Sequence, residues 1–66
     1  MRLVVNGAAY DCAEGATVAQ LVRAVSGGDR GSAVAVDGVV LRRGEWDAVE
    51  LREGQVVELV HAVQGG

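Results

Sequence analysis

Two dipeptides, Asn6-Gly7 and Asp37-Gly38, limit the folds open to this chain more than any other feature. Each lies between two short segments with an alternating or apolar pattern. Such a dipeptide is a strong signal for a two-residue hairpin turn, because both central positions need a positive φ. The sequence therefore predicts two β-hairpins. They join residues 2–5 to 8–12 and residues 33–36 to 39–41.

A helix is predicted between the two hairpins. Thr17 and Gln20 have the spacing of a capping box, in which the hydroxyl and the amide satisfy free backbone donors at a helix start. Apolar residues then recur at i, i+3, i+4 and i+7, and Gly27-Gly28 is typical of a helix end. The apolar face of this helix and the inner faces of the strands together give the expected core. Its members are Leu3, Val5, Val18, Leu21, Val22, Val25, Val34, Val36, Val57 and Leu59, with Tyr10, Cys12 and Leu51 beside them.

The longest predicted strand runs over residues 56–63 and has two different faces. Val57 and Leu59 share the face that suits the core, whereas Glu58 and Val60 point to the other side. If the first strand lies alongside, the outer side carries a modest exposed apolar strip, which often marks a partner site. Scattered surface hydrophobic residues are the alternative, because they are common. The residues of this expected partner interface are Val4, Val60 and Ala62.

The composition excludes several classes of function. Six arginines and no lysine stand against nine acidic residues, and the formal charge of −3 repels nucleic acid. No segment has the apolar length of a signal peptide or a membrane span, so we expect a soluble cytoplasmic protein that does not bind membranes. A single cysteine rules out an internal disulfide and, with no His or Cys near it, offers no metal-site spacing. We therefore expect no bound metal.

Three single residues have both a structural and a functional interpretation. Cys12 is either a small buried side chain or a reactive thiol, and the sequence places no base or cation beside it. Trp46 is either a lid on a small core or a platform for a ligand. His61, without a neighbouring carboxylate or cysteine, is expected to be an edge residue rather than a catalyst. The structural interpretation is favoured for all three.

The tail Gln64-Gly65-Gly66 follows the last strand pattern. Glycine lacks a Cβ, so a Gly-Gly segment is flexible and thin enough to enter a narrow active site of another protein. We expect one domain over residues 1–66 with a flexible tail, and we expect the Gly66 carboxylate to be its reactive group. A frayed terminus without a function is the alternative.

The order hairpin, helix, hairpin and final strand predicts an α+β fold in which one helix covers one face of a small mixed sheet. Short motifs support this order along the whole chain. They are Val5-Asn6-Gly7, Cys12-Ala13-Glu14-Gly15, Thr17-Val18 with Leu21, Ala35-Val36-Asp37-Gly38, Arg43 with Trp46, Glu53-Gly54, and residues 57–66.

With these motifs the chain resembles the ubiquitin-like β-grasp proteins and, more narrowly, the ThiS family of sulfur carriers. The resemblance implies a sheet of four to five strands packed on one helix. Members typically carry Val-Pro-Arg before the Trp, whereas this chain has Leu41-Arg42-Arg43, so the proline is replaced and the local loop path is open.

The resemblance also implies a role for the tail. A partner adenylating enzyme, related to ubiquitin activators, would use ATP to convert the Gly66 carboxylate to an acyl-adenylate. Sulfur from a donor such as a cysteine desulfurase would then give a thiocarboxylate, which thiazole synthase would use for the thiazole ring of thiamine. The carrier itself would be a monomer when free, without a bound cofactor or a catalytic group.

Two other functions have the same tail. The small subunit of molybdopterin synthase is a similar β-grasp carrier, although it is usually longer, and Arg43 with Trp46 favours the thiamine branch. A protein modifier or interaction module would instead form an isopeptide through Gly66. An enzyme is disfavoured, because no paired carboxylates, Cys/His pair or phosphate loop can be assembled, and Gly27-Gly28 lacks the Lys-Ser/Thr ending of a P-loop.

Overall fold

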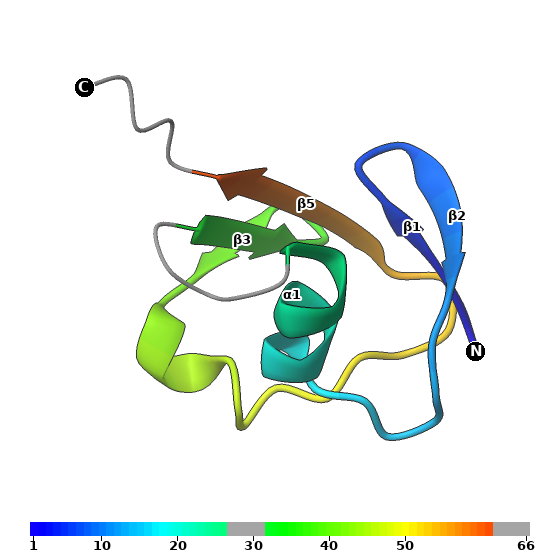
Figure 1. Cartoon of the computed structure of the whole chain (residues 1–66), viewed down its shortest axis with the longest axis horizontal. Coiled ribbons are helices and arrows are strands. Elements are labelled where there is room, and N and C mark those ends of the chain that lie inside the picture. The colour runs from blue at the N-terminus through cyan, green and yellow to red at the C-terminus, as the bar shows by residue number, and fades with distance from the viewer. Residues whose placement is uncertain (27–31, 62–66) are drawn as a thin grey trace.

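The polypeptide folds into five strands and one α-helix in the computed structural model, which describes residues 1–26 and 32–61 (Figure 1). The elements in chain order are β1 (Arg2–Val5), β2 (Ala8–Asp11), α1 (Val18–Ser26), β3 (Ser32–Val36), β4 (Val39–Leu41), the 3₁₀ turn η1 (Arg43–Glu45) and β5 (Val56–His61). The predicted α+β fold, with four to five strands and one helix, is confirmed.

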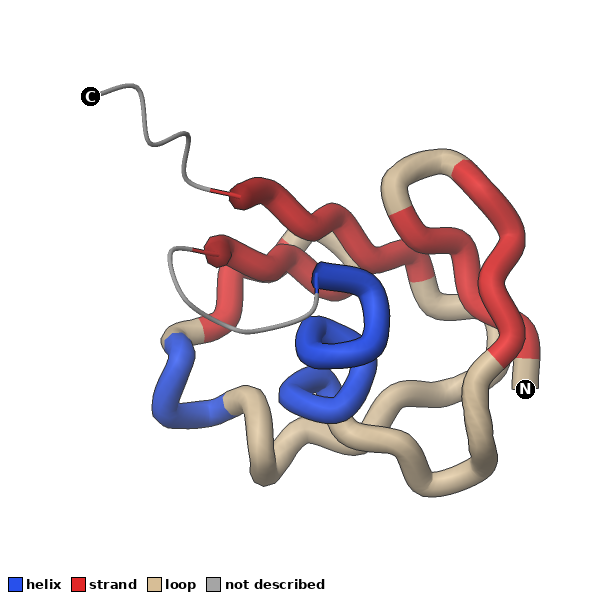
Figure 2. Tube along the Cα trace, in the orientation of Figure 1, coloured by secondary structure: helices blue, strands red, loops and turns tan. Residues whose placement is uncertain are grey.

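The strands form one mixed sheet in the order β2-β1-β5-β3-β4. β5 is central and lies parallel to β1, with Val4 beside Val56, whereas the other neighbouring strands are antiparallel. The helix α1 lies against one face of the sheet and leaves the opposite face open, as the tube in Figure 2 shows. The last strand in the sequence is therefore the middle strand in space.

Both hairpin turns form at the predicted dipeptides. Asn6 and Gly7 have φ values of 50° and 82°, and Asp37 and Gly38 have values of 50° and 83°. Positive φ at both central positions defines the turn whose twist matches that of the flanking strands.

The two turns also hold β5 from its two sides. Asn6 extends the β1 side: its Nδ2 donates to the Leu59 carbonyl at 3.1 Å, and its Oδ1 accepts from the Leu59 N–H at 2.8 Å. On the β3 side, Asp37 Oδ1 accepts a hydrogen bond from the Val56 N–H at 2.9 Å. Each side chain makes a hydrogen bond to β5 that a further residue of the neighbouring strand would otherwise make. The backbone of β5 is therefore hydrogen-bonded past the points where β1 and β3 end.

The capping box at the start of α1 is confirmed. The Thr17 N–H donates to Gln20 Oε1 at 2.9 Å, and the Gln20 N–H donates to Thr17 Oγ1 at 3.2 Å. The helix then runs to Ser26, and the predicted glycine end at Gly27-Gly28 lies outside the described residues. No helix in the described part of the chain is long and apolar enough to cross a membrane.

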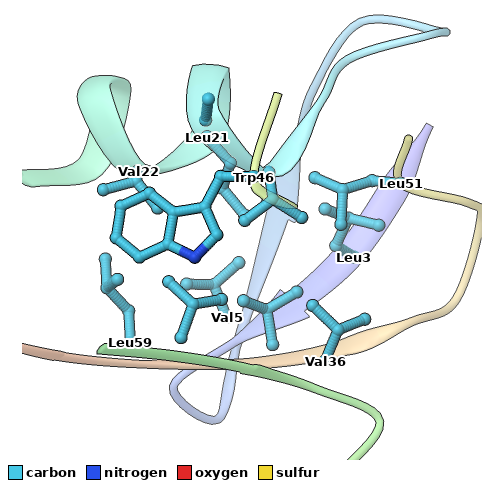
Figure 3. Close-up of a cluster of buried hydrophobic side chains, with 12 residues drawn as sticks. Leu3, Val5, Leu21, Val22, Val36, Trp46, Leu51 and Leu59 are labelled. Carbon is cyan, nitrogen blue, oxygen red and sulfur yellow. The ribbon is translucent and has the colours of Figure 1, made fainter. Parts of the chain in front are cut away.

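The core forms between α1 and the inner face of the sheet. Trp46 is only 2% exposed, and Figure 3 shows its indole ring between side chains of the helix and of the sheet. Its Nε1 donates to the Leu41 carbonyl at 3.4 Å, so burial leaves the ring nitrogen paired. The structure thus supports the interpretation of Trp46 as a lid on the core, because the buried indole ring has no open face for a ligand. The cluster comprises Leu3, Val5, Val18, Ala19, Leu21, Val22, Val34, Val36, Trp46, Leu51, Val57 and Leu59.

The prediction that Val25 belongs to the core is wrong. Val25 is 38% exposed, because it sits in the last turn of a nine-residue helix, at the margin of the core. Tyr10 and Cys12 lie on the predicted inner side but are half-buried, since β2 is an edge strand and ends at Asp11. The last strand is described as far as His61, and the rest of its predicted length lies outside the described residues.

Arg42 keeps the loop path that a proline would favour. Its φ of −72° falls in the range that a proline ring imposes, so the replaced proline does not redirect the chain. The Arg42 N–H also donates to Glu45 Oε1 at 2.8 Å, a bond that proline cannot make. This bond helps to close η1, which leads directly into Trp46.

A first prediction tests the core. Leu21 is 3% exposed, so Leu21→Ala should lower the free energy of unfolding by about 2–5 kcal/mol, measured by denaturant titration. Val25→Ala on the same helix is the matched control and should cost less than about 1.5 kcal/mol, because that side chain is already part-exposed. A wild-type denaturant midpoint for Leu21→Ala would show that the helix does not pack on the sheet as described.

A second prediction tests how the first turn holds β5. Asn6→Ala should cost about 2–4 kcal/mol, because it removes two hydrogen bonds to Leu59 and places a Cβ-bearing residue without a compensating side chain at positive φ. Asn6→Gly removes the same bonds but tolerates that φ, so it should cost less than Asn6→Ala. If both variants unfold like the wild type, the Asn6 side chain does not stabilise β5.

Candidate functional site

The candidate site is built around β5, because this strand leads into the predicted tail. Its last described pair is Ser32 with His61, where β5 ends in the middle of the sheet (Figure 1). Gln64, Gly65 and Gly66, together with Ala62 of the predicted interface, lie outside the described residues. The structure therefore shows the base from which the tail starts, and the role of the tail stays a prediction.

The outer face of the sheet carries exposed apolar side chains next to this base. Val60 is 62% exposed and lies opposite Ala33 of β3. Val40 of β4 is 74% exposed and lies opposite Ala35 of the same strand. Cross-strand partners share one face of a sheet, so these four side chains point away from α1. They line a shallow hollow of about 210 Å³, and Glu58 lies at its border.

The exposed apolar residues around Val60 are not the ones expected for the outer strip. Val4 is half-buried and lies beside Val56, four residues before Val60 along β5, so Val4 and Val60 are not neighbours. The apolar surface around Val60 instead extends over β3 and β4. The Asp37-Gly38 turn could have indicated this, because a two-residue turn fixes Ala35 opposite Val40. Whether a partner binds there stays a prediction.

Charges on this outer face are unevenly compensated. On β1 and β2, Arg2 Nε donates to Asp11 Oδ1 at 2.9 Å. This hydrogen bond, with the attraction between the charges, raises the pKa of the exposed Arg2 guanidinium. Glu58 on β5 is exposed and forms no ion pair or side-chain hydrogen bond with any described residue. It is the one charged residue on the outer side of the described strands without a partner on the sheet.

A second hollow, of about 250 Å³, lies between the edge strand β2 and α1. Tyr10, Cys12, Gln20 and Leu21 are among its lining residues. Cys12 is half-buried there, and no histidine or carboxylate among the described residues lines the hollow as a possible base for the thiol. Across the described ranges, no group of three or more His, Cys, Asp or Glu side chains is placed to hold a metal ion.

The comparisons with known proteins agree on one family. The model of the ThiS family matches residues 3–66. Among solved structures, the crystal structure of the thiamine biosynthesis protein ThiS from Geobacter metallireducens is 32% identical, with a TM-score of 0.84 and complete coverage of both chains. The solution structure of a thiamine biosynthesis protein from the same organism is 33% identical, with a TM-score of 0.81, covering all of this chain and 88% of that one. No curated protein matches with significant similarity.

The motifs, the five-stranded sheet with its central last strand, and the match over residues 3–66 lead to the same conclusion. The chain belongs to the ThiS family of small sulfur carriers and has their ubiquitin-like β-grasp fold.

Proposed function

We propose that this protein carries sulfur on Gly66 for the synthesis of the thiazole part of thiamine. The observation that carries the proposal is the full-length similarity to a thiamine biosynthesis protein, together with a family match that extends to residue 66. The architecture supports it, because β5, which is paired on both sides, ends at His61, five residues before Gly66 in the sequence. We place the protein in the cytoplasm, where ATP and reduced sulfur donors are available.

The chemistry needs two steps, both on a partner. A carboxylate is a poor acyl donor, so an adenylating enzyme first joins the Gly66 carboxylate to AMP from ATP, releasing pyrophosphate. Sulfide then attacks the acyl carbon and AMP leaves, which gives the thiocarboxylate. If a persulfide from a desulfurase attacks instead, the product is an acyl disulfide, and a further thiol must reduce it. The sulfur of the thiocarboxylate is a soft nucleophile, suited to transfer by thiazole synthase.

This chain contributes shape rather than catalytic groups to both steps. Gly65 and Gly66 have no side chains, so the partner active site can close around backbone alone. The sheet supplies a rigid surface at the base of the tail, which lowers the entropy cost of placing the carboxylate next to ATP. The exposed Val60 is part of that surface and is proposed to contact the partner.

A third prediction concerns the tail. Deleting Gly66 sets the terminal carboxylate back by up to about 3.6 Å, and a misplacement of about 1 Å can already slow catalysis about a hundredfold. Gly65→Val adds a branched side chain where the enzyme must close on backbone. Neither variant should form thiocarboxylate at a measurable rate in an intact-mass assay with ATP, a sulfur donor and the adenylating enzyme. Gly44→Ala is the control, because an added Cβ meets open space there. Sulfur loading of both tail variants at the wild-type rate would refute the carrier function.

A fourth prediction concerns the outer face. Val60→Thr keeps the side-chain shape but places a hydroxyl in the proposed contact, which should cost about 1–2 kcal/mol and raise the KM for the carrier roughly 5- to 30-fold. Val39→Thr is a matched control, because Val39 is 61% exposed but lies opposite Val36, on the other side of the sheet. Equal KM values for the two variants would remove Val60 from the interface.

The same assay separates this proposal from the two other functions of such a tail. A protein modifier would give an isopeptide with a target and no stable thiocarboxylate. A molybdopterin synthase subunit would give the thiocarboxylate but would not support thiazole formation by purified thiazole synthase.

A further inference from the structure

The first hairpin turn contains a pair of residues that is open to spontaneous chemical change. The backbone nitrogen of a residue that follows asparagine can attack the asparagine side chain, and glycine hinders this attack least because it lacks a Cβ. Asn6 is the single asparagine in the sequence, and both Asn6 and Gly7 are exposed to water. The second turn, Asp37-Gly38, offers a carboxylate instead, which is a poorer electrophile than an amide. The reaction is therefore expected at Asn6.

The reaction has two steps and needs only water and a base. The base removes the Gly7 amide proton, the Gly7 nitrogen forms a bond to Asn6 Cγ, the bond from Cγ to Nδ2 breaks, and the leaving nitrogen takes a proton from water and departs as ammonia. Water then opens the cyclic imide. If the new bond to Cγ breaks, the product is aspartate. If the original backbone bond breaks, the product is isoaspartate, in which the main chain runs through Cγ and gains a methylene.

The fold restrains Asn6 from this reaction through β5. Asn6 Nδ2 donates to the Leu59 carbonyl at 3.1 Å, and Asn6 Oδ1 accepts from the Leu59 N–H at 2.8 Å. The Asn6 N–H also donates to the Val57 carbonyl at 2.9 Å. Ring closure brings Cγ to bonding distance of the Gly7 nitrogen, which requires rotation of the side chain and of the backbone at Asn6. These rotations break the hydrogen bonds to Leu59, so β5 must open there first.

We propose that Asn6 is a deamidation site and that the opening of β5 at Leu59 sets its rate. In the closed state both polar atoms of the amide are bound to β5, whereas in the open state the turn reacts like an unstructured peptide. When opening and closing are fast compared with the chemical step, the observed rate follows the population of the open state. The inference goes beyond the proposed function and does not depend on the chemistry of Gly66.

The products cannot restore both hydrogen bonds. An ionised carboxylate only accepts hydrogen bonds, so aspartate in place of Asn6 can bind the Leu59 N–H but presents its second oxygen to the Leu59 carbonyl. Isoaspartate adds a methylene to a two-residue turn that closes the pair Val5 and Ala8. Leu59 lies close to the end of β5 at His61. Deamidation should therefore loosen β5 near the base of the tail.

The first measurement compares the folded wild-type protein with a peptide of residues 1–12 in the same mildly alkaline buffer. Intact mass follows the replacement of an amino group by a hydroxyl, fragmentation locates it at Asn6, and an isoaspartate-specific methyltransferase detects the second product. Because two hydrogen bonds hold the amide, the protein should deamidate at least about tenfold more slowly than the peptide. Equal rates would overturn the inference, because the fold would then not protect Asn6.

Two variants test whether β5 controls the rate. Leu59 is 6% exposed, so Leu59→Ala weakens β5 but keeps the backbone groups that bind Asn6, whereas Val39, the control, is 61% exposed. Hydrogen exchange at the Leu59 N–H measures the opening in the same buffer. Leu59→Ala should speed both exchange and deamidation by the same factor, roughly tenfold or more, and Val39→Ala should change neither. Faster exchange with a wild-type deamidation rate would contradict the inference.

Wild-type protein in urea below its unfolding midpoint replaces Leu59→Ala if that variant does not fold. Exchange at the Leu59 N–H and deamidation at Asn6 should then rise together with the urea concentration. Deamidation that stays constant while the exchange rate rises would show that another motion controls the reaction.

Asn6→Asp tests the effect of the modification itself. The Leu59 N–H should exchange about fivefold faster or more than in the wild type, because the donor to the Leu59 carbonyl is lost. Wild-type exchange in Asn6→Asp and in the purified isoaspartate form would show that deamidation does not loosen β5.

Discussion

The structure depends on the pairing of β5 in the middle of the sheet. This strand is the last in the sequence, yet it joins the first hairpin to the second, since β1 lies on one side of it and β3 on the other. The two turn residues with positive φ extend this pairing. Asn6 binds both backbone groups of Leu59, and Asp37 binds the Val56 N–H. Without β5 the chain would be two separate hairpins and one helix, and isolated hairpins are marginally stable at best.

This arrangement suits the proposed function, in which a small domain presents its tail to other proteins. The pairing of β5 on both sides gives a rigid base directly before residues 62–66, while the helix covers only one face of the sheet. The other face stays open, with Val40 and Val60 exposed and Glu58 unpaired within the described residues. In the proposed function the partner enzymes would supply the chemistry, so the carrier would need only its Gly-Gly tail and an adjacent recognition face.

Much of the fold could be predicted from local signals. The two turn dipeptides, the Thr17 to Gln20 capping box and the alternation in the last strand each depend on neighbouring residues, and each appears in the structure. The errors involve contacts between distant segments. The parallel register that sets Val4 beside Val56 is fixed by no turn, so the membership of the outer strip could not be derived. The exposure of Val25 depends on where the helix ends relative to the sheet. The hydrogen bonds from Asn6 and Asp37 to β5 join residues far apart in the sequence, so no local pattern could predict them.

The central claim is that Gly66 receives sulfur. The most direct measurement is mass spectrometry of the wild-type protein after incubation with ATP, a sulfur donor and the adenylating enzyme, followed by fragmentation to locate the change. The account predicts exchange of one oxygen for one sulfur, located at Gly66, which disappears when ATP is omitted and is consumed when thiazole synthase and its substrates are added. An unchanged mass with active enzyme, or sulfur located on Cys12 instead of Gly66, would contradict it.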